Sequence, residues 1–257
     1  MLNFIKNLAL EAGALAMKRR KSLSISGLHF KNAKDLVTDV DREVEQFIRS
    51  AVEAKYPDHA FLGEEGGLED HNHSEYLWIV DPIDGTTSYV HDSPMYSVSI
   101  GIRKNGVPFA GAIGVPRLNE LYYAQAGKGA FLNDEQIHVS SRDQLVHCVA
   151  ETGFACLRAG RKKNNLPHFC RIAPLVRDIR RLGSAAIDMA FVAAGRSDFF
   201  WEMELQPYDI AAGEIILLEA GGKVTDFEGG TDYPVKKGIV ASNGIVHDKI
   251  LELLAMD

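Results

Sequence analysis

Residues 77–87 read Leu-Trp-Ile-Val-Asp-Pro-Ile-Asp-Gly-Thr-Thr. The apolar run of residues 77–80 stops at Asp81, which is typical of a buried strand that carries a carboxylate at its end. Pro82 then fixes one backbone angle and has no N–H to donate, and Gly85 permits a bend that other residues resist. This stretch therefore predicts a strand that leads directly into an acidic turn.

The acidic turn suits a hard metal ion. Asp81 and Asp84 are so close in sequence that their carboxylates would repel each other and raise a pKa unless a cation lay between them. Magnesium prefers oxygen ligands, and the carbonyl of Ile83 is a further donor in the same turn. Residues 85–87 can begin a helix whose free N–H groups face an anion. The alternative is an ordinary surface turn, because Asp, Pro and Gly are all turn residues.

Three other segments place acidic residues at predicted boundaries between elements. Residues 63–66 read Gly-Glu-Glu-Gly, residues 35–41 precede a predicted helix, and Asp209 opens an apolar helix. Taken singly, Glu64 is typical of a solvated loop, and Asp209 of a helix N-terminus, where acidic residues are favoured. The combination of these segments with residues 77–87 is what favours a metal site.

The hydrophobic pattern of the chain changes near residue 140. Before this point, helical patterns give way to alternating stretches and turns typical of an antiparallel sheet; after it, helical stretches alternate with short strands. We expect two tightly packed halves with a site between them. The first half, 1–140, carries most of the acidic segments, and the second, 141–257, carries Asp209. The expected helices span about 2–16, 40–52, 166–178, 184–195, 208–220 and from 247 on, and the expected strands about 77–80, 96–102, 107–115, 118–124, 198–201, 223–227 and 237–241.

Composition narrows the function classes. The 257-residue chain has a net charge of −7, which argues against a broad nucleic-acid footprint, since phosphate backbones are held mainly by Lys and Arg. Its three cysteines form no C-x-x-C pair, so we expect free thiols in a reducing cytoplasm. No apolar run approaches the roughly 18 residues of a membrane span, and the N-terminus lacks the pattern of a secretory signal. We expect a cytoplasmic protein that binds neither membranes nor nucleic acid.

Together these motifs resemble the signatures of the inositol monophosphatase family, which belongs to the metal-dependent, lithium-sensitive phosphatase superfamily. The resemblance rests on residues 63–65, 78–87 and 208–213, in the order that the family has, and it extends over essentially the whole chain. It implies an α/β fold, a layered αβαβα sandwich with a largely antiparallel N-terminal sheet and a smaller mixed C-terminal sheet. It also implies a homodimer that hydrolyses a small phosphate monoester, with inositol 1-phosphate as the leading candidate. The reaction would use water activated by two or three Mg²⁺ ions in each active site.

The resemblance implies roles for individual residues. The metal ligands would be Glu64, Asp81, the carbonyl of Ile83, Asp84 and Asp209. Glu64 would also assist catalysis through a weaker third ion, and Thr86, linked to Asp41, would help to activate the attacking water. The residues that would bind the phosphate and the hydroxyl groups of the substrate are Asp84, Gly85, Thr86, Gly183, Ser184, Ala185, Glu202, Asp209 and Lys31.

Several alternatives remain open. Relatives with this fold hydrolyse histidinol phosphate, fructose 1,6-bisphosphate or nucleotide 3′-phosphates, and some bacterial relatives are accessory proteins of the transcription machinery. Glu204 stands where bacterial relatives often carry lysine, and its charge would disfavour a second phosphate nearby. Arg180 and Arg181 either clamp a phosphate or pair with carboxylates at a dimer interface, whereas Arg158 belongs to a basic run typical of a solvated face.

Overall fold

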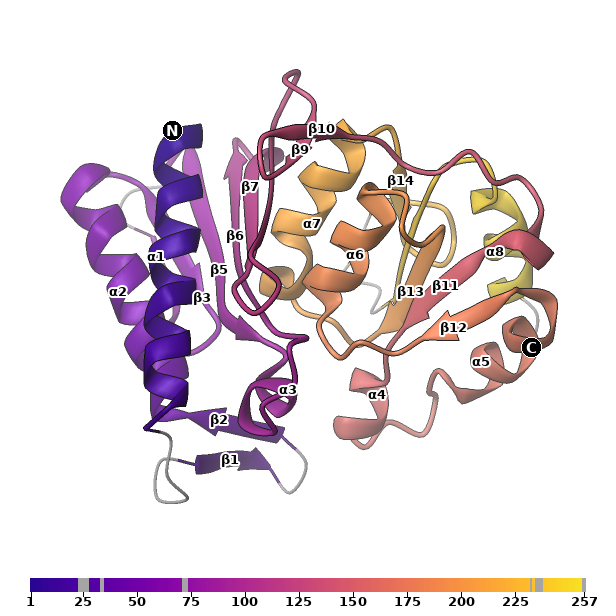
Figure 1. Ribbon diagram of the computed structural model, residues 1–257, viewed down its shortest axis with the longest axis horizontal. Coiled ribbons are helices and arrows are strands. Elements are labelled where there is room, and N and C mark those ends of the chain that lie inside the picture. Colours follow the sequence, from indigo (N-terminus) through magenta and orange to yellow (C-terminus); the bar gives the residue numbers. More distant parts are fainter. Residues whose placement is uncertain (23–27, 33–34, 71–73, 232, 234–237, 256–257) are drawn as a thin grey trace.

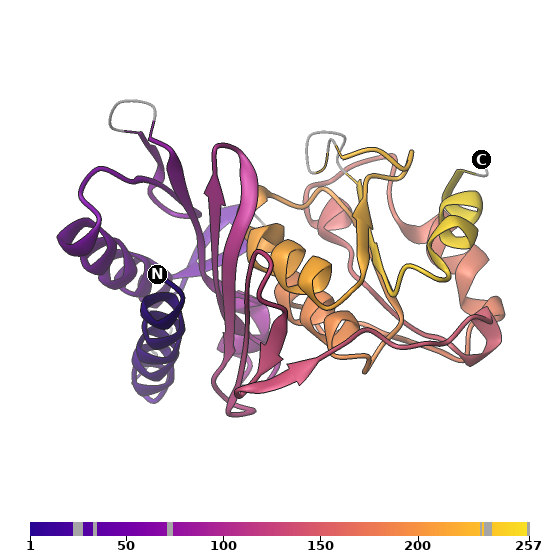
Figure 2. The same cartoon turned by 90° about the horizontal axis from the view of Figure 1, so that it is seen from above.

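The computed structural model describes residues 1–22, 28–32, 35–70, 74–231, 233 and 238–255, with the backbone alone over 28–32 and 35–37. Its elements stack in αβαβα order, with the N-terminal helices at one end and the C-terminus at the other (Figures 1 and 2). The outer helices on one side are α1 (Leu2–Arg20) and α2 (Asp39–Lys55), and those on the other are α5 (Leu166–Ile172) and α8 (His247–Ala255). The central helices are α6 (Ala185–Ala193) and α7 (Pro207–Glu219). The expected sandwich is confirmed.

The large sheet has eight strands in the order β10-β9-β8-β7-β6-β5-β3-β4. Every neighbouring pair is antiparallel except β3 with β5, which are parallel. This agrees with the largely antiparallel sheet expected for the N-terminal half. The strands are β3 (Ala60–Gly63), β4 (Gly67–Glu69), β5 (Tyr76–Asp84), β6 (Ser97–Lys104), β7 (Val107–Val115), β8 (Glu120–Gln125), β9 (Ala130–Leu132) and β10 (Glu135–Ile137).

The small sheet has five strands in the order β12-β11-β13-β15-β14. Strand β11 is parallel to β12 and β13, whereas β15 is antiparallel to β13 and β14, so this sheet is mixed as expected. The strands are β11 (Val149–Thr152), β12 (Asp178–Arg180), β13 (Phe199–Met203), β14 (Lys223–Thr225) and β15 (Gly238–Ser242). The remaining elements are the hairpin of β1 (Leu28–Asn32) and β2 (Asp35–Thr38), the short helices α3 (Thr86–Val90) and α4 (Ala155–Arg158), and the 3-10 turns η2 (Leu145–His147) and η3 (Ala173–Leu175).

Helix α7 lies close against the large sheet because two strands carry glycine beneath it. A Cβ atom on Gly101 of β6 would lie 2.6 Å from the Cβ of Ala211, and one on Gly111 of β7 would lie 2.6 Å from Cγ2 of Ile215. Any larger residue would push the helix away. Residues 210–217 of α7 are buried throughout, as expected of a helix between two layers. The close packing brings the N-terminus of α7 to the end of β5.

Several expected elements have different limits in the structure, and for two of them the cause is local. The helix expected over 166–178 stops at Ile172, and η3 follows, because Pro174 has no N–H for a helical hydrogen bond. Residues 178–180 instead form the edge strand β12. The strand expected from residue 118 starts at Glu120, since Asn119 adopts a left-handed turn conformation with φ of 54°.

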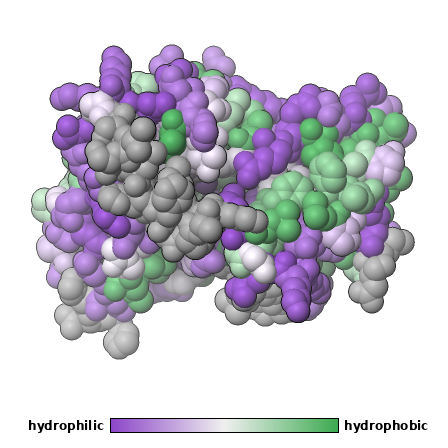
Figure 3. All heavy atoms as spheres, turned by 90° about the horizontal axis from the view of Figure 1, so that it is seen from below, coloured by the Kyte–Doolittle hydropathy of each residue, from purple (hydrophilic) through white to green (hydrophobic). Residues whose placement is uncertain are grey.

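The face that carries α3 and α4 shows an uneven distribution of hydropathy. Seen from this side, hydrophilic residues dominate the half formed by the N-terminal helices, and a band of hydrophobic residues lies on the C-terminal half (Figure 3). Within the described ranges, no helix combines the length and the apolar character needed to cross a membrane.

Candidate metal centre

Strand β5 brings Asp81 and Asp84 to the same place. The sequence predicted that the strand ends at Asp81, but it continues to Asp84, and its pairing with β6 shifts register between these two residues. In a regular strand, residues three positions apart point to opposite faces. The extra residue in β5 acts as a bulge and turns both carboxylates toward one cavity.

Asp209 completes a cluster of three carboxylates. One carboxylate oxygen from each of Asp81, Asp84 and Asp209 lies within 4.8 Å of the others. Asp209 also caps α7, because its Oδ2 accepts a hydrogen bond from the N–H of Gln206 at 2.5 Å. The capping role and the place in the cluster therefore occur together.

Glu64 joins this cluster from the loop after β3. Its N–H donates to the Val80 carbonyl at 3.1 Å, and its charge is among the causes that raise the pKa of Asp81. Glu45, a buried residue of α2, supports the loop by accepting hydrogen bonds from the N–H groups of Glu65 and Gly66, both at 2.8 Å. Glu64, Asp81, Asp84 and Asp209 are called the acidic cluster below.

The environment of the three aspartates disfavours their charged form. Burial raises the pKa of Asp81 and of Asp209 well above its usual range, and repulsion from neighbouring carboxylates adds to this shift. The pKa of Asp84 is also raised by burial, although Ser184 and the N–H of Ala186 donate to its Oδ2 at 2.6 and 2.7 Å and oppose that shift. Among the described residues, no Lys or Arg forms an ion pair with the three aspartates. Asp81 and Asp84 are buried, and closely spaced carboxylates of this kind are a fitting site for a cation.

Thr86 lies between two acceptors at the start of α3. Its Oγ1 is 3.3 Å from Oδ1 of Asp41 and 3.2 Å from the carbonyl oxygen of Ile83. Asp41 is buried, and its Oδ2 accepts hydrogen bonds from the N–H of Thr38 at 2.9 Å and from its hydroxyl at 2.6 Å. Burial raises the pKa of Asp41 to about 7. The Thr86 hydroxyl has one hydrogen to donate, so it hydrogen-bonds either to the Asp41 carboxylate or to the Ile83 carbonyl.

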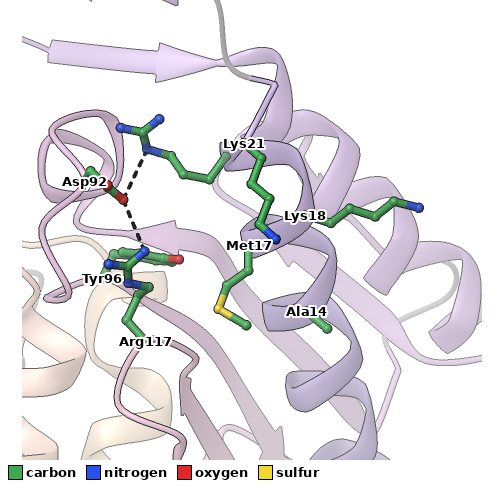
Figure 4. A pocket seen from close by; sticks show the side chains of 8 residues that line it. Ala14, Met17, Lys18, Lys21, Asp92, Tyr96 and Arg117 are labelled. Carbon is green, nitrogen blue, oxygen red and sulfur yellow. Dashed lines mark hydrogen bonds and ion pairs between the residues drawn. The ribbon is translucent and has the colours of Figure 1, made fainter.

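Helix α3 is held in place from behind by α1. Arg20 donates hydrogen bonds to the carbonyls of Tyr89 and Val90 at 2.6 and 2.9 Å, and the Tyr89 hydroxyl donates to the carbonyl of Ala16 at 2.9 Å. Asp92 pairs with Arg117 at 3.2 Å, on the wall of a separate cavity of about 420 Å³ (Figure 4). None of the four residues of the acidic cluster lines this second cavity, so we do not assign the metal site to it.

The acidic cluster forms one wall of a cavity of about 280 Å³, called the main cavity. Its lining brings together residues from both halves of the chain, namely Glu64, Asp81, Ile83, Asp84, Gly85, Thr86, Thr87, Arg158, Arg181, Gly183 and Asp209. A smaller cavity of about 230 Å³, called the side cavity, shares Glu64, Arg158 and Asp209 with it.

The expected substrate contacts divide into two groups. Gly85, Thr86 and Gly183 line the main cavity, but Ser184, Ala185 and Glu202 do not. Ser184 caps α6 and donates to Asp84, and Glu202 is buried and accepts a hydrogen bond from the N–H of Ala155 at 2.8 Å. The side chain of Lys31 lies outside the described residues, although its backbone forms part of β1.

Sequence reasoning missed two kinds of site residue. Arg158 was expected on a solvated face, yet it lines both cavities, because it is the last residue of α4. Glu45 resembles a surface charge of an amphipathic helix but is only 4% exposed. The small residues Gly63 and Gly66 on either side of Glu64 were a usable signal, since a Cβ on either would overlap Glu45.

Comparisons with known proteins agree with this geometry. The profile of the inositol monophosphatase family matches residues 1–256. An inositol-1-monophosphatase of Mesorhizobium japonicum is 38% identical over 98% of this chain and 95% of its own length. A fructose-1,6-bisphosphatase/inositol-1-monophosphatase of Thermotoga maritima is 42% identical over 86% of this chain and 83% of its own. The Nus factor SuhB of Pseudomonas aeruginosa is 39% identical over 95% of this chain and 91% of its own.

Solved structures agree as well. The inositol monophosphatase of Anabaena superposes with a TM-score of 0.89 at 38% identity, over 98% of this chain and 94% of that one. Identity at this level over nearly the full length agrees with the family match and with the acidic cluster. The chain therefore belongs to the inositol monophosphatase family.

Proposed function

We propose that this protein hydrolyses a small phosphate monoester with Mg²⁺, and that inositol 1-phosphate is its foremost substrate. The observation that carries the proposal is the approach of Asp81, Asp84 and Asp209 to within 4.8 Å of one another, on the wall of a cavity with room for a small ester. Membership of a phosphatase family supports the reaction type.

The donor set fits Mg²⁺. This ion prefers carboxylate and carbonyl oxygens at about 2.1 Å, so ligands on opposite sides of one ion are about 4.2 Å apart. The oxygens of the three aspartates need only a small contraction to reach that spacing. Asp81, Asp84 and Asp209 would hold one ion, whereas Glu64, Asp81 and the Ile83 carbonyl would hold a second and Glu64 would assist a third.

The chain's own groups would position the reacting atoms. Bound Mg²⁺ would offset charge on the phosphoryl oxygens and lower the pKa of a water molecule. When the Thr86 hydroxyl donates its hydrogen bond to Asp41, the lone pairs of its oxygen are free to accept a hydrogen bond from the attacking water. The N–H groups of Gly85 and Thr86, at the start of α3, would hold the phosphate, since the first N–H groups of a helix have no acceptor within it.

The test is the release of inorganic phosphate from a panel of esters, with and without Mg²⁺. The panel contains inositol 1-phosphate, histidinol phosphate, fructose 1,6-bisphosphate and a nucleotide 3′-phosphate. We expect Asp81→Asn to lower turnover by orders of magnitude, and Li⁺ to inhibit the wild type. The matched control is Asp248→Asn, because this aspartate is exposed and pairs only with Lys223 in the described structure. Unchanged turnover in Asp81→Asn, or no Mg²⁺-dependent release from any ester, would refute the proposal.

We also propose that the protein is a cytoplasmic homodimer, as its family resemblance implies. Light scattering after gel filtration measures the mass directly, and a mass near 28.3 kDa, that of one chain, would contradict the dimer.

A second candidate function is that of an accessory protein of the transcription machinery, because the relative from Pseudomonas aeruginosa is named a Nus factor. The net charge of −7 does not favour direct contact with RNA, so a protein partner is the better expectation. A pull-down with RNA polymerase, repeated with Asp84→Asn, separates the two functions. Binding that survives this substitution, in a protein that hydrolyses no ester, would favour the second candidate over the first.

A further inference from the structure

The second cavity, of about 420 Å³, lies between α1 and the turn that follows α3 (Figure 4). This volume is within the range of small-molecule pockets, which runs from about 300 to 1,000 Å³. Its lining comes from the end of α1, from the segment between α3 and β6, and from the turn between β7 and β8. The residues that line it are Ala14, Met17, Lys18, Arg20, Lys21, Asp92, Tyr96 and Arg117.

The lining of the second cavity is strongly basic. Four of its residues are Lys or Arg, and among the described residues that line it only Asp92 is acidic, so three positive charges are in excess. Lys18 and Lys21 form no ion pair and no side-chain hydrogen bond within the part of the chain that the structure describes. A concave surface with charge of one sign attracts ligands of the other sign, although the chain as a whole has a net charge of −7. The second cavity therefore favours an anion.

Asp92 is a weak partner for the arginines of this cavity. Its Oδ1 lies 3.2 Å from Nη1 of Arg117 and 3.9 Å from Nε of Arg20, so the two guanidinium groups share one oxygen (Figure 4). The Asp92 side chain is 57% exposed, and ion pairs in contact with water stabilise a protein little. Arg117 uses one of its five N–H donors on Asp92, so others are available to a ligand.

The hydroxyl of Tyr96 is a further donor in this cavity. Tyr96 is only 2% exposed, yet its hydroxyl has no hydrogen-bond partner among the described residues. Its ring lies beside Asp92 and Arg117, and the hydroxyl points toward α1 (Figure 4). Burial raises the pKa of Tyr96, so the hydroxyl keeps its proton at neutral pH. A buried hydroxyl without a partner costs free energy, which an acceptor atom of a ligand would offset.

Ala14 and Met17 give the second cavity an apolar side. Both residues also line a neighbouring cavity of about 200 Å³, and Leu10 on its wall is 52% exposed. The basic and the apolar parts of the lining thus meet at α1. This combination suits a ligand that has an anionic group and a carbon body.

We propose that the second cavity binds a small phosphate ester at a site separate from the acidic cluster. The phosphate oxygens accept hydrogen bonds from Lys21, Arg117 and the Tyr96 hydroxyl, and the carbon body lies against Ala14 and Met17. A phosphate suits this lining because its oxygens accept charge-assisted hydrogen bonds from several donors at once. Binding here needs no metal ion and breaks no bond, so it goes beyond the proposed hydrolysis.

The test is calorimetric titration of the full chain, freed of metal with a chelating resin, with butylphosphonate. This probe mimics a phosphate ester, but it has no ester bond for a phosphatase to hydrolyse. Without metal, the carboxylates of the acidic cluster repel an anion, so binding there is suppressed. We expect saturable binding with a Kd of about 1 mM or lower, and about tenfold weaker binding of inorganic phosphate, which has no carbon body.

Three variants remove the proposed donors one at a time. Lys21→Gln and Arg117→Gln should each weaken binding about fivefold or more, as the loss of a hydrogen bond to a charged group does. Tyr96→Phe should weaken it about fivefold without lowering the Tm, because the hydroxyl has no partner in the described structure. An unchanged Tm together with weaker binding separates a role in binding from a role in folding.

A fourth variant should gain affinity. Asp92→Asn removes the acidic group of the lining and should tighten binding about threefold or more. Asparagine tolerates the left-handed conformation of this residue, whose φ is 59°. The matched control is Lys128→Gln, because this lysine is exposed and lines neither the second cavity nor its apolar neighbour.

Each outcome bears on the proposal. Losses at Lys21, Arg117 and Tyr96 with a gain at Asp92 support it. Wild-type protein that shows no saturation by about 10 mM, or variants that all bind like wild type, overturn it. Equal weakening in Lys128→Gln, or no effect of Tyr96→Phe, would mean that the anion is attracted by diffuse charge alone, and this also overturns the inference. None of these measurements depends on turnover, so failure of the proposed function is detected separately.

Discussion

Replacing Asp209 with Asn should stabilise the metal-free protein and weaken the stabilisation that Mg²⁺ provides. Two unit charges 4.8 Å apart repel each other by about 3.5 kcal/mol at an effective dielectric constant of about 20. Asp209 has two such neighbours, Asp81 and Asp84, but uptake of a proton relieves much of the repulsion. We therefore expect a net gain of about 1–3 kcal/mol in the free energy of unfolding. Asparagine keeps a side-chain oxygen for the N–H of Gln206, so the cap of α7 is not lost.

The assay is thermal unfolding in EDTA, followed by titration with Mg²⁺. A gain of this size corresponds to a rise in Tm of about 2–10 °C for a chain of this length. Mg²⁺ at 100 times its Kd adds about 2.7 kcal/mol to a protein that binds one ion in the folded state only, so the wild type should overtake the variant as metal is added. Asp248→Asn, at a side chain that is 85% exposed, should change neither curve by more than about 0.5 kcal/mol.

The reasoning fails if Asp209→Asn unfolds at a lower temperature than wild type in EDTA. It also fails if Mg²⁺ raises the Tm of both proteins equally. In the first case the carboxylates would not repel each other in the folded state, and in the second Asp209 would not be a ligand.

Three further predictions concern single side chains. Thr86→Val should lower kcat about 100-fold with little change in Tm, and Thr86→Ser should retain most activity, because only the hydroxyl is needed; steady-state kinetics check this. Glu45→Gln should cost about 1.5–3 kcal/mol in urea unfolding and reduce turnover, since an amide cannot accept both N–H groups that hold the Glu64 loop. His247 is buried, its Nδ1 and Nε2 face the hydroxyls of Ser242 and Thr225, and burial lowers its pKa to about 4. Its contribution is therefore present above pH 6.5 and is lost as the pH falls toward 4, by about 3 kcal/mol in total; urea unfolding of His247→Gln should lack that part of the slope.

The sequence was sufficient for the elements with strong patterns. The apolar run that leads into Asp81 predicted β5, and the apolar helix after Asp209 predicted α7. The short strands β4 and β12 were not predicted, because three residues carry too little alternation to distinguish a strand from a loop. The ends of elements depended on local events, such as Pro174 in η3, that a periodic pattern does not weigh.

The sequence predicted which residues form the site better than it predicted how they are arranged. The motif around Asp81 and Asp84 named both residues, but their common direction depends on a bulge that only the pairing with β6 reveals. Arg158 gave no signal, since the difference between a solvated arginine and one that lines a cavity lies in tertiary packing. Glu45 was missed for the same reason, because burial of a helix charge depends on the loop that packs over it.

Asp209 shows why the common role and the functional role of one residue should not be treated as mutually exclusive. On the sequence, a helix cap and a metal ligand are rival readings of one acidic residue, and the cap is the commoner role. A carboxylate has two oxygens and about four lone-pair sites, however, so one N–H does not exhaust it. Oδ2 of Asp209 caps α7 while the carboxylate stays within 4.8 Å of those of Asp81 and Asp84. The cap in fact fixes the carboxylate in the cluster, and the ordinary role thereby becomes a reason for the functional one.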